Sequence, residues 1–409
     1  MENPKIRFKG FTKDWEQRKF SELVTIERGG SPRPIDKFIT NDENGLNWVK
    51  IGDAPEQGNY ITQTAEKIRP EGLSKTREVH PGDLILSNSM SFGRPYIMAI
   101  DGCIHDGWLA IRDTKKNFDL KFLCTLLGTD GMLNQYKAMA AGSTVNNLNK
   151  ELVGGTTVTF PMVEEQIKIG DYFTTLDHLI TLHQRKCEQT KKLKKYMLQK
   201  MFPQNGAKVP EIRFYGFTYD WEQRKLIDYL EVSSEKNRDN RFTKEDVLSV
   251  SGEYGIVNQI EFQGRSFAGA SVSNYGVVEN GDVVYTKSPL KSNPYGIIKT
   301  NKGIPGIVST LYAVYKPKEI TDSKFVQIYF ELDSRMNSYM HPLVNKGAKN
   351  DMKVSAENAL KGMVSFPKKD EQEMISLYFS TLDHLITLHQ RKCDELKKMK
   401  KYMLQNMFI

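Results

Sequence analysis

Long apolar runs are missing from the sequence. Hydrophobic residues make up 39% of its 409 residues, and no run approaches the roughly 18 residues that a membrane-spanning helix needs. The first residues, Met1-Glu-Asn-Pro-Lys-Ile-Arg, hold no apolar stretch like that of a secretory signal. Cysteine is scarce, with four residues and no Cys-x-x-Cys pair. These absences argue against a membrane protein and a disulfide scaffold, and they predict inert thiols in a reducing cytoplasm.

The sequence also lacks the loops that enzymes use to hold nucleotide cofactors. It has no Gly-x-x-x-x-Gly-Lys-Ser/Thr loop, so ATP hydrolysis is not expected. Asn293-Pro294-Tyr295 resembles the Asn/Asp-Pro-Pro-Tyr loop of amino-group DNA methyltransferases, but the second proline is missing. No Gly-rich loop follows a strand, as S-adenosylmethionine binding would need, and no Ser/His/Asp or Cys/His set has a familiar spacing. We therefore expect no catalytic residue and no cofactor in this chain.

Histidine is also rare, and its spacing does not favour a metal site. His178 and His183 are five residues apart, as are His384 and His389. Two metal ligands on one helix need a spacing of three or four residues to share a face. The pattern predicts packing of these rings between helices, and no metal ligand is assigned.

An internal repeat is the main feature that the sequence does contain. Residues 175–187 recur letter for letter as residues 381–393, and in the wider windows 166–202 and 372–408 the identity is 27 of 37 positions. A second match has the same offset, because residues 4–20 and 210–226 agree at 13 of 17 positions. The chain is therefore one unit of about 206 residues written twice.

The segments between the matched ends, 21–159 and 227–365, are equally long but share little visible sequence. Both contain strand-like runs and turns, at 46–51, 79–86 and 107–112 in the first and at 277–285 and 311–315 in the second. Helices are expected at 120–127 and 324–333. The pattern predicts an α+β fold in which two mixed, β-rich inserts share a fold and differ in surface.

Two long helices are predicted where the repeat is strongest. Apolar residues step by four and three through each copy, as in a coiled-coil seam, and each helix is roughly 60 Å long. Packing one copy on the other as an antiparallel intramolecular coiled coil would bury both stripes and give a pseudo-two-fold frame. The predicted helix-pair interface consists of Leu176, Leu179, Ile180, His183, Leu382, Leu385, Ile386 and His389.

The net charge of +8 and the pI near 9.0 suit a nucleic-acid partner, although many basic proteins bind none. The lysine runs 191–195 and 397–401 are solvated helix faces or contacts to phosphate or a protein partner. Polar loops that follow strands of the inserts are better candidates, because such side chains reach phosphates and base edges. The candidate DNA-binding residues are Ser87, Asn88, Ser89, Arg94, Ser143, Thr144, Asn146, Asn147, Lys287, Ser288, Lys291, Asn293, Tyr295, Lys346, Lys349 and Asn350.

The whole layout resembles the specificity subunit of type I restriction–modification systems. The resemblance rests on the duplicated helix with Gln166 and residues 175–187, on the duplicated Arg7-Phe-x-Gly-Phe-x-x-Asp-Trp-Glu-x-Arg-Lys19, and on the two different inserts. It implies that each insert is a target recognition domain for one half of a split, asymmetric sequence in double-stranded DNA. It also implies that the helices dock two modification subunits, which bind S-adenosylmethionine and methylate adenine, and through them a motor and nuclease subunit that uses ATP and Mg.

From this resemblance we expect a first recognition domain with its repeat segment at 1–162 and a first repeated helix at 163–202. A second recognition domain is expected at 203–368 and a second helix at 369–409. The chain would be a non-catalytic, cytoplasmic subunit that recognises DNA. The alternative is a coiled-coil scaffold that presents two ligand-binding domains to partners other than nucleic acid, and salt-dependent DNA binding would separate the two hypotheses.

Overall fold

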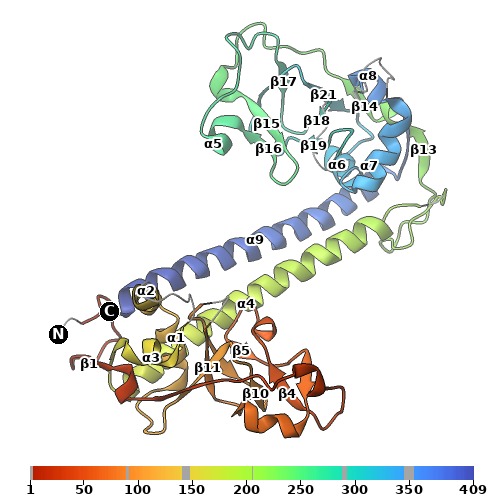
Figure 1. The fold of residues 1–409 in the computed structure, drawn as a ribbon. Coiled ribbons are helices and arrows are strands. Elements are labelled where there is room, and N and C mark those ends of the chain that lie inside the picture. The colour runs from red at the N-terminus through yellow and green to blue at the C-terminus, as the bar shows by residue number, and fades with distance from the viewer. Residues whose placement is uncertain (1–2, 89–91, 141–147, 205, 288–292, 345–353) are drawn as a thin grey trace. The chain divides into compact units, whose positions relative to one another are not determined.

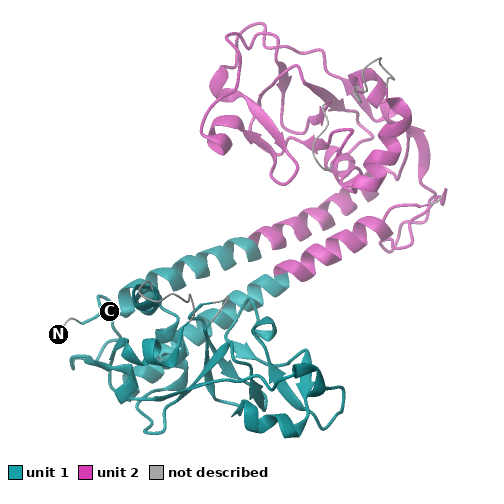
Figure 2. Cartoon of the chain, in the orientation of Figure 1, with its two compact units in different colours: residues 1–186, 389–409 teal, residues 187–388 magenta. Residues whose placement is uncertain are grey.

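A computed structural model describes residues 3–88, 92–140, 148–204, 206–287, 293–344 and 354–409. Its contacts divide the chain into two compact units, shown in Figure 2. Unit 1 is formed by residues 1–186 and 389–409, and unit 2 by residues 187–388. Each unit contains one insert and part of both long helices. Within the described residues, no helix is both long and apolar enough to cross a bilayer.

Unit 1 is built around two five-stranded sheets, in the orders β2-β11-β8-β9-β5 and β3-β6-β4-β10-β7, and a two-stranded sheet β1-β12. Three short helices, α1 (Leu120–Leu127), α2 (Asp130–Ala140) and α3 (Lys150–Gly155), complete it (Figure 1). Its strands are β1 (Glu16–Lys19), β2 (Thr25–Arg28), β3 (Ile39–Thr40), β4 (Leu46–Val49), β5 (Tyr60–Ile61), β6 (Glu66–Ile68), β7 (Arg77–Val79), β8 (Leu84–Ser87), β9 (Pro95–Met98), β10 (Gly102–Ile104), β11 (Trp108–Arg112) and β12 (Thr157–Phe160).

Unit 2 repeats part of this plan with a four-stranded sheet β14-β21-β18-β19 and three two-stranded sheets, β13-β22, β15-β16 and β17-β20. Its short helices are α5 (Gln259–Gln263), α6 (Ser323–Tyr329), α7 (Asp333–Met340) and α8 (Ala356–Ala359). Its strands are β13 (Glu222–Lys225), β14 (Leu230–Val232), β15 (Leu248–Ser251), β16 (Gly255–Asn258), β17 (Gly276–Val278), β18 (Val283–Thr286), β19 (Ile298–Thr300), β20 (Gly306–Val308), β21 (Tyr312–Pro317) and β22 (Met363–Phe366). The α+β prediction is confirmed.

The two long helices are α4 (Val163–Lys200) and α9 (Lys369–Met407). Within unit 1, Asp177 of α4 faces Lys400 of α9 at 2.5 Å, and His183 faces His389 at 3.0 Å. Residue numbers rise along one helix as they fall along the other, so the two segments run antiparallel. Within unit 2, Leu382 near the start of α9 shares a buried cluster with Leu198 near the end of α4, which fits the same antiparallel direction.

The predicted interface residues differ in how deeply they are buried. Leu176, Ile180 and Leu382 are buried, whereas Leu179, His183, Leu385, Ile386 and His389 are partly exposed. In unit 1 Leu176 and Ile180 belong to one core with Leu396 of α9 and with Phe408, which follows that helix. In unit 2 the Sγ atom of Cys187 lies 3.8 Å from the carbonyl oxygen of Ile386. The apolar stripe of each helix therefore packs against both the other helix and the insert.

The repeated N-terminal segments fasten each insert to a helix in the same way. Glu165 at the start of α4 is fully buried and accepts two hydrogen bonds from the Arg7 guanidinium, at 2.7 and 2.8 Å. In unit 2 Glu371 accepts the equivalent bonds from Arg213 at 2.8 and 2.7 Å. A buried carboxylate requires such a partner, which explains why both members of the pair recur in the repeat.

The repeated glutamine near the start of each long helix makes a second matching connection. The side-chain oxygen of Gln166 accepts from the backbone N–H of Asp119, which caps α1, and its nitrogen donates to the carbonyl oxygen of Pro161, both at 2.9 Å. Gln372 makes the corresponding bonds to Asp322 and Pro367, also at 2.9 Å. The two frames are therefore equivalent in detail, although the inserts that they hold differ.

Candidate nucleic-acid interface

In unit 1 the base of one predicted loop lies beside the end of another. Ser87 and Arg94 close the first loop with two hydrogen bonds. The Ser87 N–H donates to the Arg94 carbonyl oxygen, and the Arg94 N–H donates to Ser87 Oγ, both at 3.0 Å. The second loop ends where the backbone N–H of Leu148 donates to the carbonyl oxygen of Asn88 at 3.0 Å. The structure therefore brings together the ends of two polar segments, at Asn88 and Leu148, that are 60 residues apart in the sequence.

The side chains at the base of these loops have internal partners. Ser87 and Asn88 are buried, and Asn88 Nδ2 donates to the carbonyl oxygen of Asp106 at 2.8 Å. Arg94 donates to the carbonyl oxygens of Glu56 and Gly58, at 3.0 and 3.2 Å, and its guanidinium lies 5.0 Å from the centre of the Tyr96 ring. These contacts fix the loop base.

Arg28 is a cation at the same place that the sequence analysis did not select. Its Nε donates to the Asp106 carbonyl oxygen at 3.3 Å, beside Asn88, and the side chain is exposed. Nothing in the local sequence marks Arg28, because it reaches Asp106 only through the pairing of β2 with β11. A cation beside two polar loops suits contact with a phosphate backbone.

In unit 2 the predicted residues Lys287 and Tyr295 lie on either side of the loop that follows β18. The Lys287 ammonium donates to the carbonyl oxygen of Thr310 at 2.7 Å, and burial lowers its pKa, as does the nearby charge of Lys236. The carbonyl oxygen of Tyr295 accepts from the Tyr285 hydroxyl at 2.7 Å. The carbonyl oxygen of Asn293 accepts from the backbone N–H of Gly296 at 3.0 Å, which closes a turn.

The remaining predicted DNA-binding residues fall outside the described part of the chain. They are Ser89, Ser143, Thr144, Asn146, Asn147, Ser288, Lys291, Lys346, Lys349 and Asn350.

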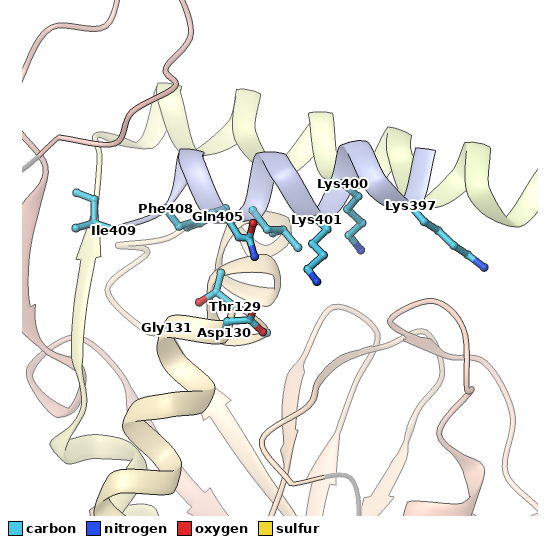
Figure 3. Close-up of a pocket in the computed structure, with 11 residues that line it drawn as sticks. Thr129, Asp130, Gly131, Lys397, Lys400, Lys401, Gln405, Phe408 and Ile409 are labelled. Atoms are coloured by element: carbon cyan, nitrogen blue, oxygen red, sulfur yellow. The ribbon is translucent and has the colours of Figure 1, made fainter. Parts of the chain in front are cut away.

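A groove of about 590 Å³ lies in unit 1 between the corner that joins α1 to α2 and the last turns of α9. Lys400 and Lys401 point from α9 towards the turn at Thr129 and Asp130, as Figure 3 shows. Lys400 is held by Asp177, whereas Lys401 makes no ion pair within the described residues. The groove is therefore basic on its helix side and apolar at its floor, where Leu404 and Phe408 line it.

At the corresponding corner of unit 2, Arg335 of α7 lies against the end of α4. Its guanidinium lies 4.3 Å from the centre of the Phe202 ring and donates to the carbonyl oxygens of Leu198 and Tyr329, both at 2.8 Å. Burial lowers the pKa of Arg335 to about 10. The repeated frames thus present different surfaces at the ends of the two long helices.

Among the described residues, no group of three or more His, Cys, Asp or Glu side chains could hold a metal ion. All four cysteines are buried and free of disulfides. Burial raises the pKa of Cys103 to about 11 and that of Cys124 to about 12, so both thiols stay protonated and unreactive at neutral pH.

The structure is of the α+β class, with one frame repeated around two different inserts. Residues 12–192 match the sequence model of the type I restriction modification DNA specificity domain. The chain is 23% identical over 432 residues to the MjaX specificity subunit of a type I restriction enzyme from Methanocaldococcus jannaschii, a match that covers 96% of this chain and 92% of the relative. The MjaIX specificity subunit of the same organism is 23% identical over 239 residues, covering 56% and 54% of the two chains.

Among solved structures, the S subunit of a type I restriction–modification system from M. genitalium has the same fold, with a TM-score of 0.61 and 13% identity. That match covers 100% of this chain and 99% of the other. The chain is thus similar to specificity subunits of type I restriction–modification systems over nearly its whole length.

Proposed function

We propose that the chain reads an asymmetric, two-part sequence in double-stranded DNA, with one insert recognising each half. The observation that carries this proposal is that matched clasps, Arg7–Glu165 and Arg213–Glu371, hold inserts with different loops. A repeated frame suits a partner with two-fold geometry, such as DNA, whereas different loops suit two different half-sites.

In this proposal the recognition domains are residues 1–162 and 203–368, and the repeated helices are residues 163–202 and 369–409. The helices dock two copies of an adenine methyltransferase subunit, which supplies S-adenosylmethionine chemistry, and a motor and nuclease subunit joins through it. The support is the repeat itself, since two copies of one helix surface fit two copies of one partner. The basic groove of unit 1 supports the same idea, because its lysines suit an acidic partner segment.

The test is the pattern of methylated adenine in a methylation-free host that carries this chain and its modification subunit. We expect one asymmetric two-part sequence to be methylated, and none when the chain is left out. The purified complex should bind an oligonucleotide with that sequence, and the binding should weaken as salt rises. Methylation that does not depend on the chain, or a complex without salt-dependent DNA binding, would favour a scaffold for other partners.

A further inference from the structure

A polar cavity of about 370 Å³ lies in unit 2 between the second insert and α9. Three separate segments of the insert line it: the turn at Asn280 and Gly281, the end of β19 with residues 300–302, and the start of α6. The helix contributes Ser380 and Asp383. An insert and a repeated helix therefore meet at one solvent-accessible site.

The charges around this cavity do not balance. Two carboxylates lie near the cavity, and both form ion pairs with Lys194: its ammonium lies 2.5 Å from Glu331 and 2.6 Å from Asp383. Lys302 and Lys324 line the cavity, and neither forms an ion pair within the described residues. The cluster thus has two exposed lysine side chains without an ion-pair partner among the described residues.

A third lysine adds to this excess from inside the protein. Lys299, next to the residues of β19 that line the cavity, is 9% exposed, and its ammonium makes no hydrogen bond or ion pair with a described residue. Burial lowers its pKa, and the charges of Lys194 and Lys302 lower it further against the attraction of Glu331 and Asp383. A buried ammonium is costly unless an anion compensates it, so the site is short of negative charge.

The cavity also has the other parts of an anion site. Asn301 accepts from the backbone N–H of Gly303 at 3.1 Å and donates to the carbonyl oxygens of Glu279 and Ile304, which fixes the turn that carries Lys302. The hydroxyl groups of Ser323 and Ser380 make no hydrogen bond to the described residues. Two free donors and a positioned lysine match the groups that proteins use to hold phosphate.

We propose that this cavity binds a phosphate of the DNA backbone, with Lys302 and Lys324 as the contacting cations, Lys299 as a buried charge behind them, and Ser323 and Ser380 as hydroxyl donors. The inference rests on the proposed function in DNA recognition. It adds that the second insert and its helix jointly contact the DNA backbone, through contacts that do not read sequence. A phosphate fits better than a partner carboxylate because the cluster holds four lysines, including Lys194, against the two carboxylates of Glu331 and Asp383, an excess of two positive charges. Each phosphate of a duplex brings a full negative charge.

The corresponding cavity of unit 1 is balanced. It is lined by Thr174 and Asp177, the repeat counterparts of Ser380 and Asp383, and its volume is about 230 Å³. Its only lining lysine, Lys121, is paired with Asp171 at 2.7 Å, and Asp177 is paired with Lys400. The phosphate site is therefore specific to unit 2, and Lys121 is a matched control.

The test measures DNA affinity of the complete complex with its modification subunit as a function of salt, on duplexes with and without the recognised sequence. For Lys302→Ala with Lys324→Ala we expect weaker binding to both duplexes and a slope of log K against log salt smaller by about 1, as for one lost phosphate. The methylated sequence should not change. Lys121→Ala should leave the slope as in the wild type.

A wild-type slope in the double variant, with normal assembly, would overturn the inference and leave the proposed function intact. Loss of modification-subunit binding with an unchanged slope would also overturn it, because the cavity would then hold an acidic protein segment. Failure of the wild-type complex to bind DNA would instead contradict the proposed function. Lys302→Glu is a second variant for the case that the alanine change has only a small effect. Charge reversal at a phosphate site must weaken DNA binding more than loss of the charge does.

Discussion

At the scale of single residues, the repeat preserves the buried contacts that hold each insert in its frame. The side chains of Glu165 and Glu371 are almost completely buried, at 0% and 3% exposure, and each carboxylate is paired with one arginine. Their surroundings are not identical, because Trp221 Nε1 also donates to Glu371 at 3.4 Å, whereas Trp15 Nε1 has no partner among the described residues. Local sequence shows that Arg7 and Glu165 recur, but it cannot show that they meet across 158 residues.

Replacing Arg7 with alanine should destabilise unit 1, because the buried Glu165 carboxylate would lose the one ion-pair partner that it has among the described residues. We expect a loss of about 3–5 kcal/mol in the free energy of unfolding, measured by urea denaturation. The control is Arg18→Ala, which removes an exposed ion pair with Glu22 and should change little. Adding Glu165→Gln to the Arg7→Ala variant should restore part of the loss, and a loss no larger than that of Arg18→Ala would argue against the clasp.

The contact between His183 and His389 should make stability depend on pH. Burial lowers the pKa of His183 below its usual 6.5, and His389, Lys186 and Lys392 lower it further. The unfolded chain then binds more protons than the folded chain just below pH 6.5, so stability is lost as the pH falls through this range. The urea concentration at the unfolding midpoint should decrease in the wild type when the pH is lowered from 7.5 to 5.5. It should decrease less in the His183→Gln, His389→Gln double variant. Equal shifts in both proteins would contradict this.

At the scale of elements, the strongest sequence patterns predicted the fold best. The long helices and α1 lie where periodicity placed them, because a sustained apolar stripe has few alternatives to a helix. Strands such as β9 and β10 were missed. They are three or four residues long and fully buried, so they show no alternation, and their pairing with distant strands decides their conformation.

Within the helix pair, burial predicts which leucines matter. Leu176 is 5% exposed and packs in the core of unit 1, whereas Leu388 on α9 is 48% exposed. Leu176→Ala should therefore cost about 2–5 kcal/mol of unfolding free energy in a urea titration. Leu388→Ala is the control and should change it far less. Similar losses in both variants would show that the apolar stripe does not pack as described.

At the scale of the whole molecule, the candidate sites are made by segments that sequence does not join. The turn at Asn280, the end of β19, the start of α6 and the helix residue Asp383 span more than a hundred residues. No local pattern marks Lys299, Lys302 and Lys324 as one cluster, whereas polar loops after strands are visible to sequence analysis. Arg28 was missed for the same reason.

If the paired helices set the spacing between the two half-sites, lengthening them should change the target. Four residues inserted into each helix beside the His183–His389 contact keep the apolar stripe nearly in phase and add about 6 Å to each helix. A duplex rises about 3.4 Å per base pair. The methylated sequence should keep both half-sites and gain about one to two base pairs between them. Two-residue insertions should instead misalign the stripes and impair folding, and an active four-residue variant with an unchanged gap would show that the helices do not set the spacing.

The most direct test of the central claim exchanges one insert. Residues 21–159 are replaced by the equivalent insert of a relative, with the clasp residues Arg7 and Glu165 retained, and the methylated sequence is read in a host that also carries the modification subunit. If each insert reads one half of the target, the new sequence keeps one half-site unchanged and takes a different second half-site. A change in both half-sites, or in neither, in a complex that still methylates DNA would contradict this account.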